Sequence, residues 1–260
     1  MSAGTALRAA LIAALMLPLV PILVWSVARG WFFPDLVPAR WSLAPWIAAL
    51  RPGSDALAAA GESLAVAGAA TAIALVVGLP AARALALHRF RGRRAVLALV
   101  AAPLLLPGIA VAMGLHPVFL ALGLGPGRAG VILVHLVPTL PYMILSLMVV
   151  FAAYDIGFED QARSLGAGPV AAFRHVALPM LLPGILAGAA FAFLVSWGQY
   201  LLTLVIGGGR VQTLPLALYS YAAAGRNDLA AVLAVLSVLP GALMLAVAAG
   251  RLRGRTAPLR

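Results

Sequence analysis

Six long apolar stretches recur along this chain of 260 residues, and they restrict its fold more than any other feature. A helix needs about 20 apolar residues to cross the roughly 30 Å of hydrocarbon in a bilayer. Backbone polar groups must be satisfied internally there, which favours helices. The stretches that are long enough are 9–28, 63–82, 95–115, 130–151, 184–206 and 229–249. We therefore predict an all-α, polytopic membrane protein with six transmembrane helices in one domain over residues 1–260.

The composition agrees with a membrane protein and excludes some kinds of site. Hydrophobic residues make up 64% of the chain and charged residues 10%, whereas soluble domains have about half and a quarter. There is no cysteine, so disulfides and thiolate metal sites are excluded. The first stretch follows Arg8 and is longer than a secretory signal core. We expect it to be a retained anchor that bends at Pro18 and Pro21.

All 18 basic residues are arginine, and their distribution predicts the orientation of the chain. Cytoplasmic loops are enriched in basic residues. If both termini are cytoplasmic, twelve arginines lie inside, namely Arg8, Arg83, Arg89, Arg91, Arg93, Arg94, Arg163, Arg174, Arg251, Arg253, Arg255 and Arg260. The six outside are Arg29, Arg40, Arg51, Arg128, Arg210 and Arg226. The net charge of +11 then reflects loops that face anionic membrane lipid, and we expect no nucleic-acid partner.

The lack of lysine excludes a nucleotide site of the Walker A type. The lysine of that loop reaches the phosphates of the nucleotide, and this chain has none to offer. Any ATP must therefore be bound by a partner.

The segment Phe158–Gly184, FEDQARSLGAGPVAAFRHVALPMLLPG, is unusual because it mixes charge, glycine and proline between two apolar stretches. It predicts a first short helix over Phe158–Leu165, with Glu159 and Asp160 at its start, where the helix dipole favours acids. Phe158, Ala162 and Leu165 share one face of this helix.

Glycine and proline divide the rest of the segment. Gly166 allows a left-handed helix end, and Gly168–Pro169 prevents continuation. A second helix is expected over Val170–Ala177, with a stop at Leu178–Pro179 and the next span starting at Pro183–Gly184. The product is a helical hairpin at the membrane surface; the alternative is an ordinary amphipathic surface segment.

This segment resembles the EAA loop of permease subunits of binding-protein-dependent ABC importers. The family pattern is Glu-Ala-Ala, three residues, Gly, nine residues, Ile, one residue, Leu-Pro. The matching positions here are Asp160, Gln161, Ala162, Gly166, Val176, Leu178 and Pro179. Gln161 is the main departure from the family pattern, because it stands in place of alanine and makes the docking surface of the loop more polar. Residues 63–86, 102–115, 133–147 and 213–221 also resemble the remaining spans of this family. Residues 34–43 are similar to the first outside loop of the branch with polyamine, iron and thiamine importers.

The resemblance implies a six-helix permease of a bacterial-type inner membrane, with residues 152–183 as the coupling loop between the fourth and fifth helices. The implied ATPase-coupling residues are Glu159, Asp160, Ala162, Arg163, Leu165, Gly166, Phe173 and Arg174. The implied partners are a cytoplasmic ATPase dimer, a second permease subunit (a related chain or a copy of this one) and an extracytoplasmic solute-binding protein. The chain would not be an enzyme: it would hold no cofactor, and ATP and Mg²⁺ would be bound by the ATPase. The implied solute is small, of polyamine, iron or thiamine type.

Polar residues in the fifth stretch are candidates for a translocation path. Ser196, Gln199, Tyr200 and Thr203 share one face of a helix. They either line a path or make interhelical hydrogen bonds. Gly184 and Gly188 permit close helix contact, within the subunit or across subunits.

Other functions are less consistent with the sequence. His116 and His135 have no His or Glu partner one turn away, so we expect structural histidines and no metal site. An ion- or proton-coupled carrier would need acids within the spans, and none lies centrally in them. An intramembrane enzyme would need a catalytic group of residues at membrane depth, and we find none.

Overall fold

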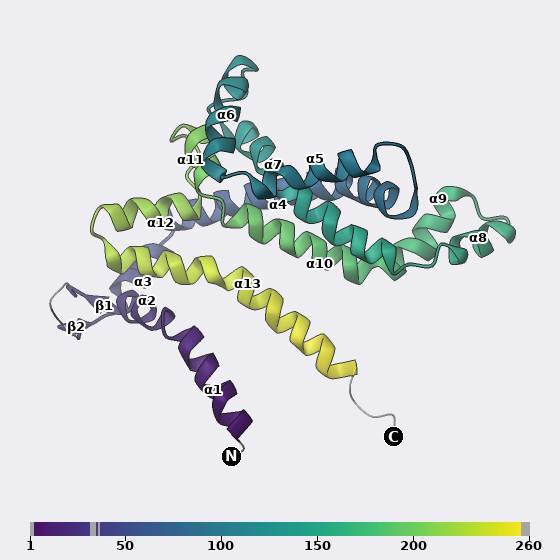
Figure 1. Cartoon of the computed structure of the whole chain (residues 1–260). Coiled ribbons are helices and arrows are strands. Elements are labelled where there is room, and N and C mark those ends of the chain that lie inside the picture. The colour runs from purple at the N-terminus through teal and green to yellow at the C-terminus, as the bar shows by residue number, and fades with distance from the viewer. Residues whose placement is uncertain (1–2, 32–34, 36, 256–260) are drawn as a thin grey trace. The chain divides into compact units, whose positions relative to one another are not determined.

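The computed structural model describes residues 3–31, 35 and 37–255 of the chain, and the described part is mostly helical (Figure 1). Its residues form two compact units, one of Met1–Ser63 with Gln212–Arg260 and one of Leu64–Val211. A long helix, α4 (Asp55–Leu87), contributes to both.

The first unit is organised around its last helix. Its elements are α1 (Ala3–Met16), α2 (Leu19–Ser26), β1 (Ala28–Arg29), β2 (Arg40–Trp41), α3 (Ala44–Leu50), α12 (Leu214–Ala223) and α13 (Asn227–Arg255). α13 packs against α2, α3 and α12. β1 and β2 form a short antiparallel pair. The Leu214 N–H donates to the Ser63 Oγ over 2.7 Å, which ties α12 to α4.

The second unit contains the remaining elements. They are the rest of α4, α5 (Arg93–Leu105), α6 (Gly108–Ala121), α7 (Arg128–Ala152), α8 (Gly157–Ser164), α9 (Pro169–Ala172), a π-helical turn (Phe173–Ala177), α10 (Leu178–Trp197) and α11 (Leu201–Gly207). α7 is central, because it packs against α5, α10 and α11.

The core of the second unit lies between α4, α7 and α10. Buried alanines of α4, among them Ala74 and Ala82, meet large α7 side chains such as Met143 and Phe151. α10 approaches α7 closely at Gly184, where a Cβ atom would overlap the Val150 side chain. The small-residue pair of α10 therefore serves a contact within the subunit. Such close packing is typical of membrane helices, which gain little from the hydrophobic effect when they associate.

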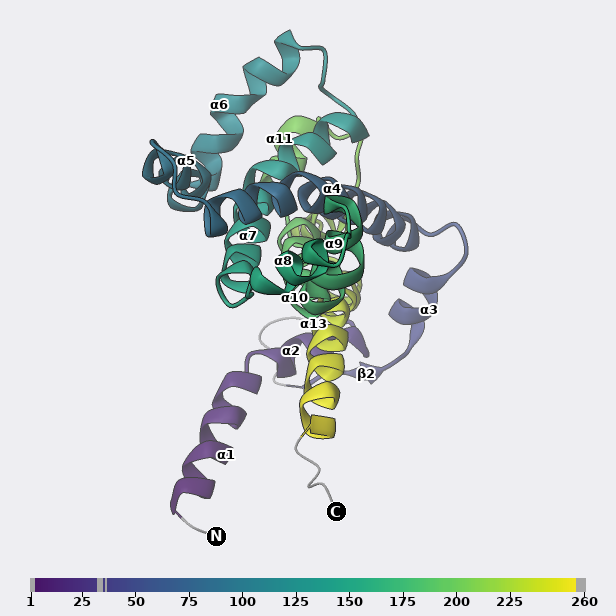
Figure 2. The same cartoon turned by 90° about the vertical axis from the view of Figure 1, so that its right-hand side faces the viewer.

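Four helices among the described residues are long and apolar enough to cross a membrane: Asp55–Leu87, Arg128–Ala152, Pro169–Trp197 and Asn227–Val247. α5 and α6 reach the same criterion only as a pair, and they are bent by 106° at the break between them (Figure 2). The described residues thus hold four such helices, or five if the pair is one span.

The first and third predicted spans are interrupted for reasons that involve proline. Helix α1 ends at Met16 and α2 begins at Leu19, so the expected bend is a break at Leu17–Pro18. Between α5 and α6, Leu106 is extended with ψ 138°. A residue that precedes proline is disfavoured in the helical region, and Pro107 follows.

The fifth predicted span begins earlier than expected, and the stop that was predicted at Leu178–Pro179 for the preceding short helix is wrong. The π-helical turn continues into α10 without interruption, so that Pro169–Trp197 is a single 29-residue helix. The Leu178 N–H donates to the Phe173 carbonyl oxygen, five residues earlier. Proline lacks an N–H and clashes with the carbonyl four residues back in a regular helix. The wider turn lies where Pro179 would otherwise make that clash.

Candidate functional site

The segment α8–α9 has the local backbone that its glycine pattern predicts. At the start of α8 the Gly157 N–H donates to the Asp155 Oδ1 over 2.9 Å. At its end Gly166 has φ +91°, and the Ala167 N–H donates to the Ala162 carbonyl over 3.0 Å. The predicted left-handed helix end at Gly166 is confirmed. α9 then folds back against α8 (Figure 2).

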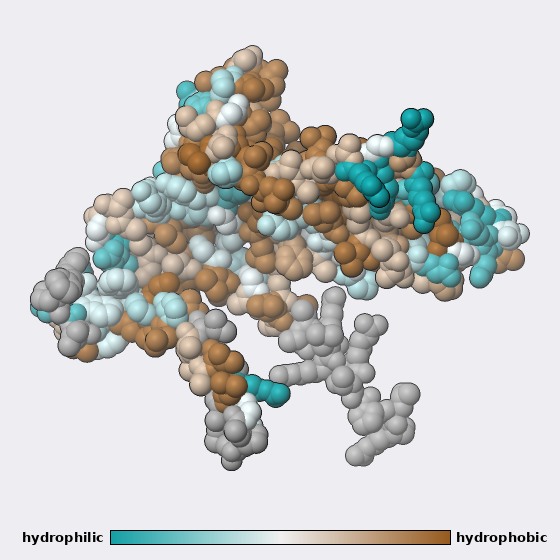
Figure 3. All heavy atoms as spheres, viewed as in Figure 1, coloured by the Kyte–Doolittle hydropathy of each residue, from teal (hydrophilic) through white to brown (hydrophobic). Residues whose placement is uncertain are grey.

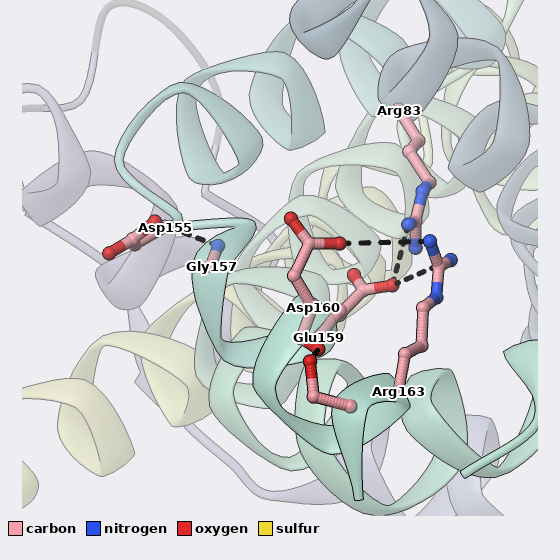
Figure 4. A network of polar contacts seen from close by, with 7 residues as sticks. Arg83, Asp155, Gly157, Glu159, Asp160 and Arg163 are labelled. Atoms are coloured by element: carbon pink, nitrogen blue, oxygen red, sulfur yellow. Dashed lines mark hydrogen bonds and ion pairs between the residues drawn. The ribbon is translucent and has the colours of Figure 1, made fainter. Parts of the chain in front are cut away.

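A buried ion pair ties α8 to α4. The Glu159 side chain is 1% exposed, and its Oε2 accepts a hydrogen bond from Arg83 Nη2 over 2.8 Å (Figure 4). Arg163 of α8 lies 3.8 Å from the same oxygen. The Arg83 guanidinium carbon also lies 5.8 Å from the centre of the Phe173 ring. Arg83 therefore connects α4 with both α8 and the π-helical turn.

Tyr154 adds a second polar group to this buried cluster. Burial raises the pKa of the Tyr154 hydroxyl, and the negative charge of Glu159 raises it further. Within the described part of the chain, neither the Tyr154 hydroxyl nor the Glu159 Oε1 has a hydrogen-bond partner of good geometry. Tyr154 thus stays neutral beside the carboxylate, whose charge is balanced by Arg83.

The predicted coupling residues divide into two groups. Glu159 and Phe173 turn toward Arg83, whereas Asp160, Arg163, Leu165, Gly166 and Arg174 are exposed and Ala162 is half-buried. Leu165 is 90% exposed, and Val170 across the turn is 79% exposed. The tip of α8–α9 therefore presents apolar side chains to its surroundings.

Arg163 has partners within its own helix. Its guanidinium lies 3.7 Å from the Asp160 carboxylate, in addition to its contact with Glu159. An exposed pair of this kind contributes little to stability. The expected pairing of Arg163 and Arg174 with acids of a partner stays a prediction.

Sequence reasoning missed the role of Arg83. It counted Arg83 only among the cytoplasmic arginines, although this residue lies apart from the arginine-rich turn that follows α4. An arginine near the end of an apolar helix, with an acid in a loop on the same side, was the available signal.

The candidate path residues lie at a break in the fifth span. α10 ends at Trp197 and α11 begins at Leu201, so the four residues do not share one continuous helix. His135 of α7 bridges the break: its Nδ1 is 2.7 Å from the Ser196 Oγ and its Nε2 is 2.8 Å from the Thr203 Oγ1. Ser196, Thr203 and His135 are all buried.

The hydrogen-bond directions follow from Thr203. Its hydroxyl donates to the Gln199 carbonyl oxygen over 3.0 Å, so it accepts from His135 Nε2–H. The His135 Nδ1 then accepts from the Ser196 hydroxyl. Ser196 and Thr203 therefore make interhelical hydrogen bonds, which was one of the two roles expected for the candidate path residues. A contact of the candidate path residues with solute stays a prediction.

A family profile and the curated relatives of this chain both point to permease proteins of transport systems. The profile of the family described as "Binding-protein-dependent transport system inner membrane component" matches residues 74–257. The spermidine/putrescine transport system permease protein PotC of Haemophilus influenzae is 29% identical over 170 residues, which is 64% of this chain and 66% of PotC. The molybdenum transport system permease protein ModB of Mycobacterium tuberculosis is 33% identical over 188 residues, which is 66% of this chain and 70% of ModB.

A solved structure has the same fold. It is a bacterial ABC transporter involved in the import of the acidic polysaccharide alginate. The TM-score is 0.72 at 18% identity, and the match covers 95% of this chain and 94% of that one. This chain spans about two thirds of the length of PotC.

Proposed function

Because this chain belongs to the family of inner membrane components of binding-protein-dependent transport systems, we propose that it is the permease subunit of an ATP-driven importer. It forms part of the path for a small solute and breaks no bond in it. The observation that carries the proposal is the segment α8–α9, which is fixed to α4 on one side and presents apolar side chains on the other.

The structure supports a direct mechanical connection from this segment into the membrane. A force on α8 reaches α4 through the Glu159–Arg83 ion pair. A force on α9 reaches the far end of α10, because Pro169–Trp197 is one helix. An ATPase whose closed dimer binds ATP more tightly than its open dimer supplies the free energy for such a movement.

The proposal includes partners and an orientation. A cytoplasmic ATPase dimer binds the tip of α8–α9, a second permease subunit completes the path, and an extracytoplasmic binding protein delivers the solute. The chain crosses a bacterial-type inner membrane six times with both termini in the cytoplasm. The interrupted pairs α1–α2 and α5–α6 then supply the first and third spans.

The solute is proposed to be selected mainly by the binding protein. The relatives carry spermidine and putrescine or molybdenum in their names, and the solved transporter imports alginate. Such a range on one fold favours selection outside the shared scaffold. A polyamine, iron or thiamine type of solute stays our proposal for this chain.

Co-purification of the ATPase tests the proposal. Gly166→Glu places charge and bulk at the tip of α8–α9, whereas Gly53→Glu makes the same change at another exposed glycine with positive φ and open space around it. We expect Gly166→Glu to lower ATPase binding at least about tenfold with an unchanged membrane yield, since a buried charge at an interface costs several kcal/mol. Gly53→Glu should bind normally.

Two outcomes would contradict the proposal. One is retained ATPase binding and transport in Gly166→Glu. The other is solute uptake into vesicles that a protonophore abolishes and ATP depletion does not, which would identify an ion-coupled carrier.

A further inference from the structure

A cluster of arginines lies between α4 and α5 in the second unit. We call residues 88–94, with the sequence HRFRGRR, the basic turn. It holds Arg89, Arg91, Arg93 and Arg94, of which all but Arg93 are exposed. Arg93 is held in place, because its Nε donates to the Leu85 carbonyl oxygen over 2.7 Å.

In the described part of the chain, no carboxylate pairs with the charges of the basic turn. Among the described residues, Arg83, Arg163 and Arg226 form ion pairs with carboxylates, and none of the four arginines of the basic turn does so. Three neighbouring guanidinium groups in water repel one another, so the cluster favours an anionic ligand.

The basic turn also borders an open hollow at the surface. A hollow of about 320 Å³ is lined by Arg89, Phe90, Gly92, Arg93 and Arg94. Gly92 has φ +88° and precedes the first residue of α5, and no side chain caps this 13-residue helix. The positive end of the helix dipole thus faces the same hollow as the guanidinium groups.

Apolar surface continues directly from the basic turn. Phe90 is 44% exposed, Val96 40% and Leu99 75%. No side chain of α5 is buried. A ligand that fits both features has an anionic head and an apolar tail, which favours a lipid over an acidic protein surface.

The basic turn lies at the same end of the second unit as α8. It follows α4 directly, and Arg83 near the end of α4 bonds Glu159 of α8. Figure 3 shows strongly hydrophilic surface gathered over the turn before α5 and over the nearby α8. Under the proposed function, on which this step rests, that end meets the cytoplasmic leaflet, which carries anionic lipids.

We propose that the basic turn binds the phosphate of an anionic phospholipid headgroup, with the acyl chains along α5. Guanidinium groups bind phosphate oxygens through paired hydrogen bonds, and uncapped N–H groups at the start of α5 add donors. The bound lipid fixes the α4–α5 connection at the membrane surface beside the Arg83–Glu159 pair.

Fluorescence quenching in nanodiscs tests this site in the whole chain. The chain has no cysteine, so Leu99→Cys gives a single site for a fluorophore on the exposed side of α5. Discs of phosphatidylcholine receive equal mole fractions of dibrominated phosphatidylglycerol or dibrominated phosphatidylcholine. The ratio of quenching by the two lipids measures preference for the anionic headgroup.

Two triple variants are compared in this background. Arg89→Gln/Arg91→Gln/Arg94→Gln removes the exposed charges of the basic turn and keeps Arg93. Arg40→Gln/Arg51→Gln/Arg210→Gln removes three other exposed arginines. We expect a preference for phosphatidylglycerol of roughly tenfold, which falls to near one in the first variant and is retained in the second. Equal melting temperatures in detergent show that both variants are folded.

Three results would overturn the proposal. The first is an equal preference for phosphatidylglycerol over phosphatidylcholine in both triple variants. The second is displacement of the lipid by inorganic phosphate at about ten millimolar, which would identify a site for free phosphate. The third is unchanged lipid preference together with lost ATPase binding in the Arg89/Arg91/Arg94 variant, which would identify a protein-docking surface. The quenching assay contains no ATPase. A negative result for lipid binding therefore leaves the Gly166→Glu test of ATPase binding unaffected.

Discussion

At the scale of single residues, the buried carboxylate of Glu159 is the feature that distinguishes this site. Sequence reasoning placed Glu159 and Asp160 correctly in the first turn of a short helix. It could not tell which of them turns inward, because the choice depends on Arg83, 76 positions away. Asp160 points outward and is 63% exposed. Two adjacent acids thus have different roles.

Glu159→Gln should weaken coupling much more than Asp160→Asn. The change leaves Arg83 without its charged partner in a mostly buried position, at a cost of about 2 kcal/mol. We expect ATP hydrolysis to continue while solute uptake in proteoliposomes falls roughly tenfold. Arg83→Glu/Glu159→Arg should restore part of the uptake. Equal effects of the two amide variants would contradict a special role for Glu159.

Tyr154 predicts a pH dependence of stability. Because its pKa is raised above the ordinary value of 10.0 in the folded state, the unfolded chain loses this proton first as pH rises. Its contribution to stability is therefore complete below about pH 10 and is lost above it. Melting temperatures between about pH 8 and pH 11 should fall less steeply for Tyr154→Phe than for the natural chain. An unchanged slope in Tyr154→Phe would contradict this role of Tyr154.

At the scale of elements, the break between α10 and α11 is a feature that hydrophobic periodicity does not predict. Apolar residues continue on both sides of Gly198–Tyr200, so the sequence predicts one span. A tertiary contact spans this break, namely the bridge from His135 to Ser196 and Thr203, and periodicity cannot display such a contact. The Gly166 helix end was predictable because a single residue decides it.

His135→Ala should destabilise the second unit. It leaves the Ser196 and Thr203 hydroxyls without their shared partner, at a cost of about 2 kcal/mol, or roughly 5 °C in melting temperature. His116→Ala is the control, since His116 is half-buried and the described residues show no side-chain hydrogen bond to it. Thermal unfolding in detergent measures both variants, and equal melting temperatures would mean that the bridge contributes nothing.

At the scale of the whole molecule, the composition and six apolar stretches predicted a helical membrane protein, and the motif spacing predicted the family. The fold class and the family could both be predicted because apolar stretches and motif spacing are local patterns that can be read directly from the sequence. The continuity of Pro169–Trp197 was not predictable, because Pro179 is an ordinary helix-ending signal unless a π-helical turn precedes it. Whether the polar residues of the broken span meet solute depends on partners that sequence rules do not describe.

Two glycines inserted after Ala177 should separate ATP use from transport. The insertion interrupts the helix from α9 to α10, and glycine disfavours helix by about 1 kcal/mol per residue. We expect ATPase binding to persist and solute uptake to fall at least about tenfold. The same insertion after Gly53, in an exposed turn, is the control. Normal uptake with the first insertion would show that movement enters the membrane by another route.

The strong exposure of Leu165 and Val170 also affects how long an unassembled copy of the chain survives in a cell. Under the proposed function, a copy made in excess of the ATPase exposes these apolar side chains, because no partner covers them. Proteases remove chains that expose such surface, so under the proposed function the abundance of this chain should follow the abundance of the ATPase that covers its tip.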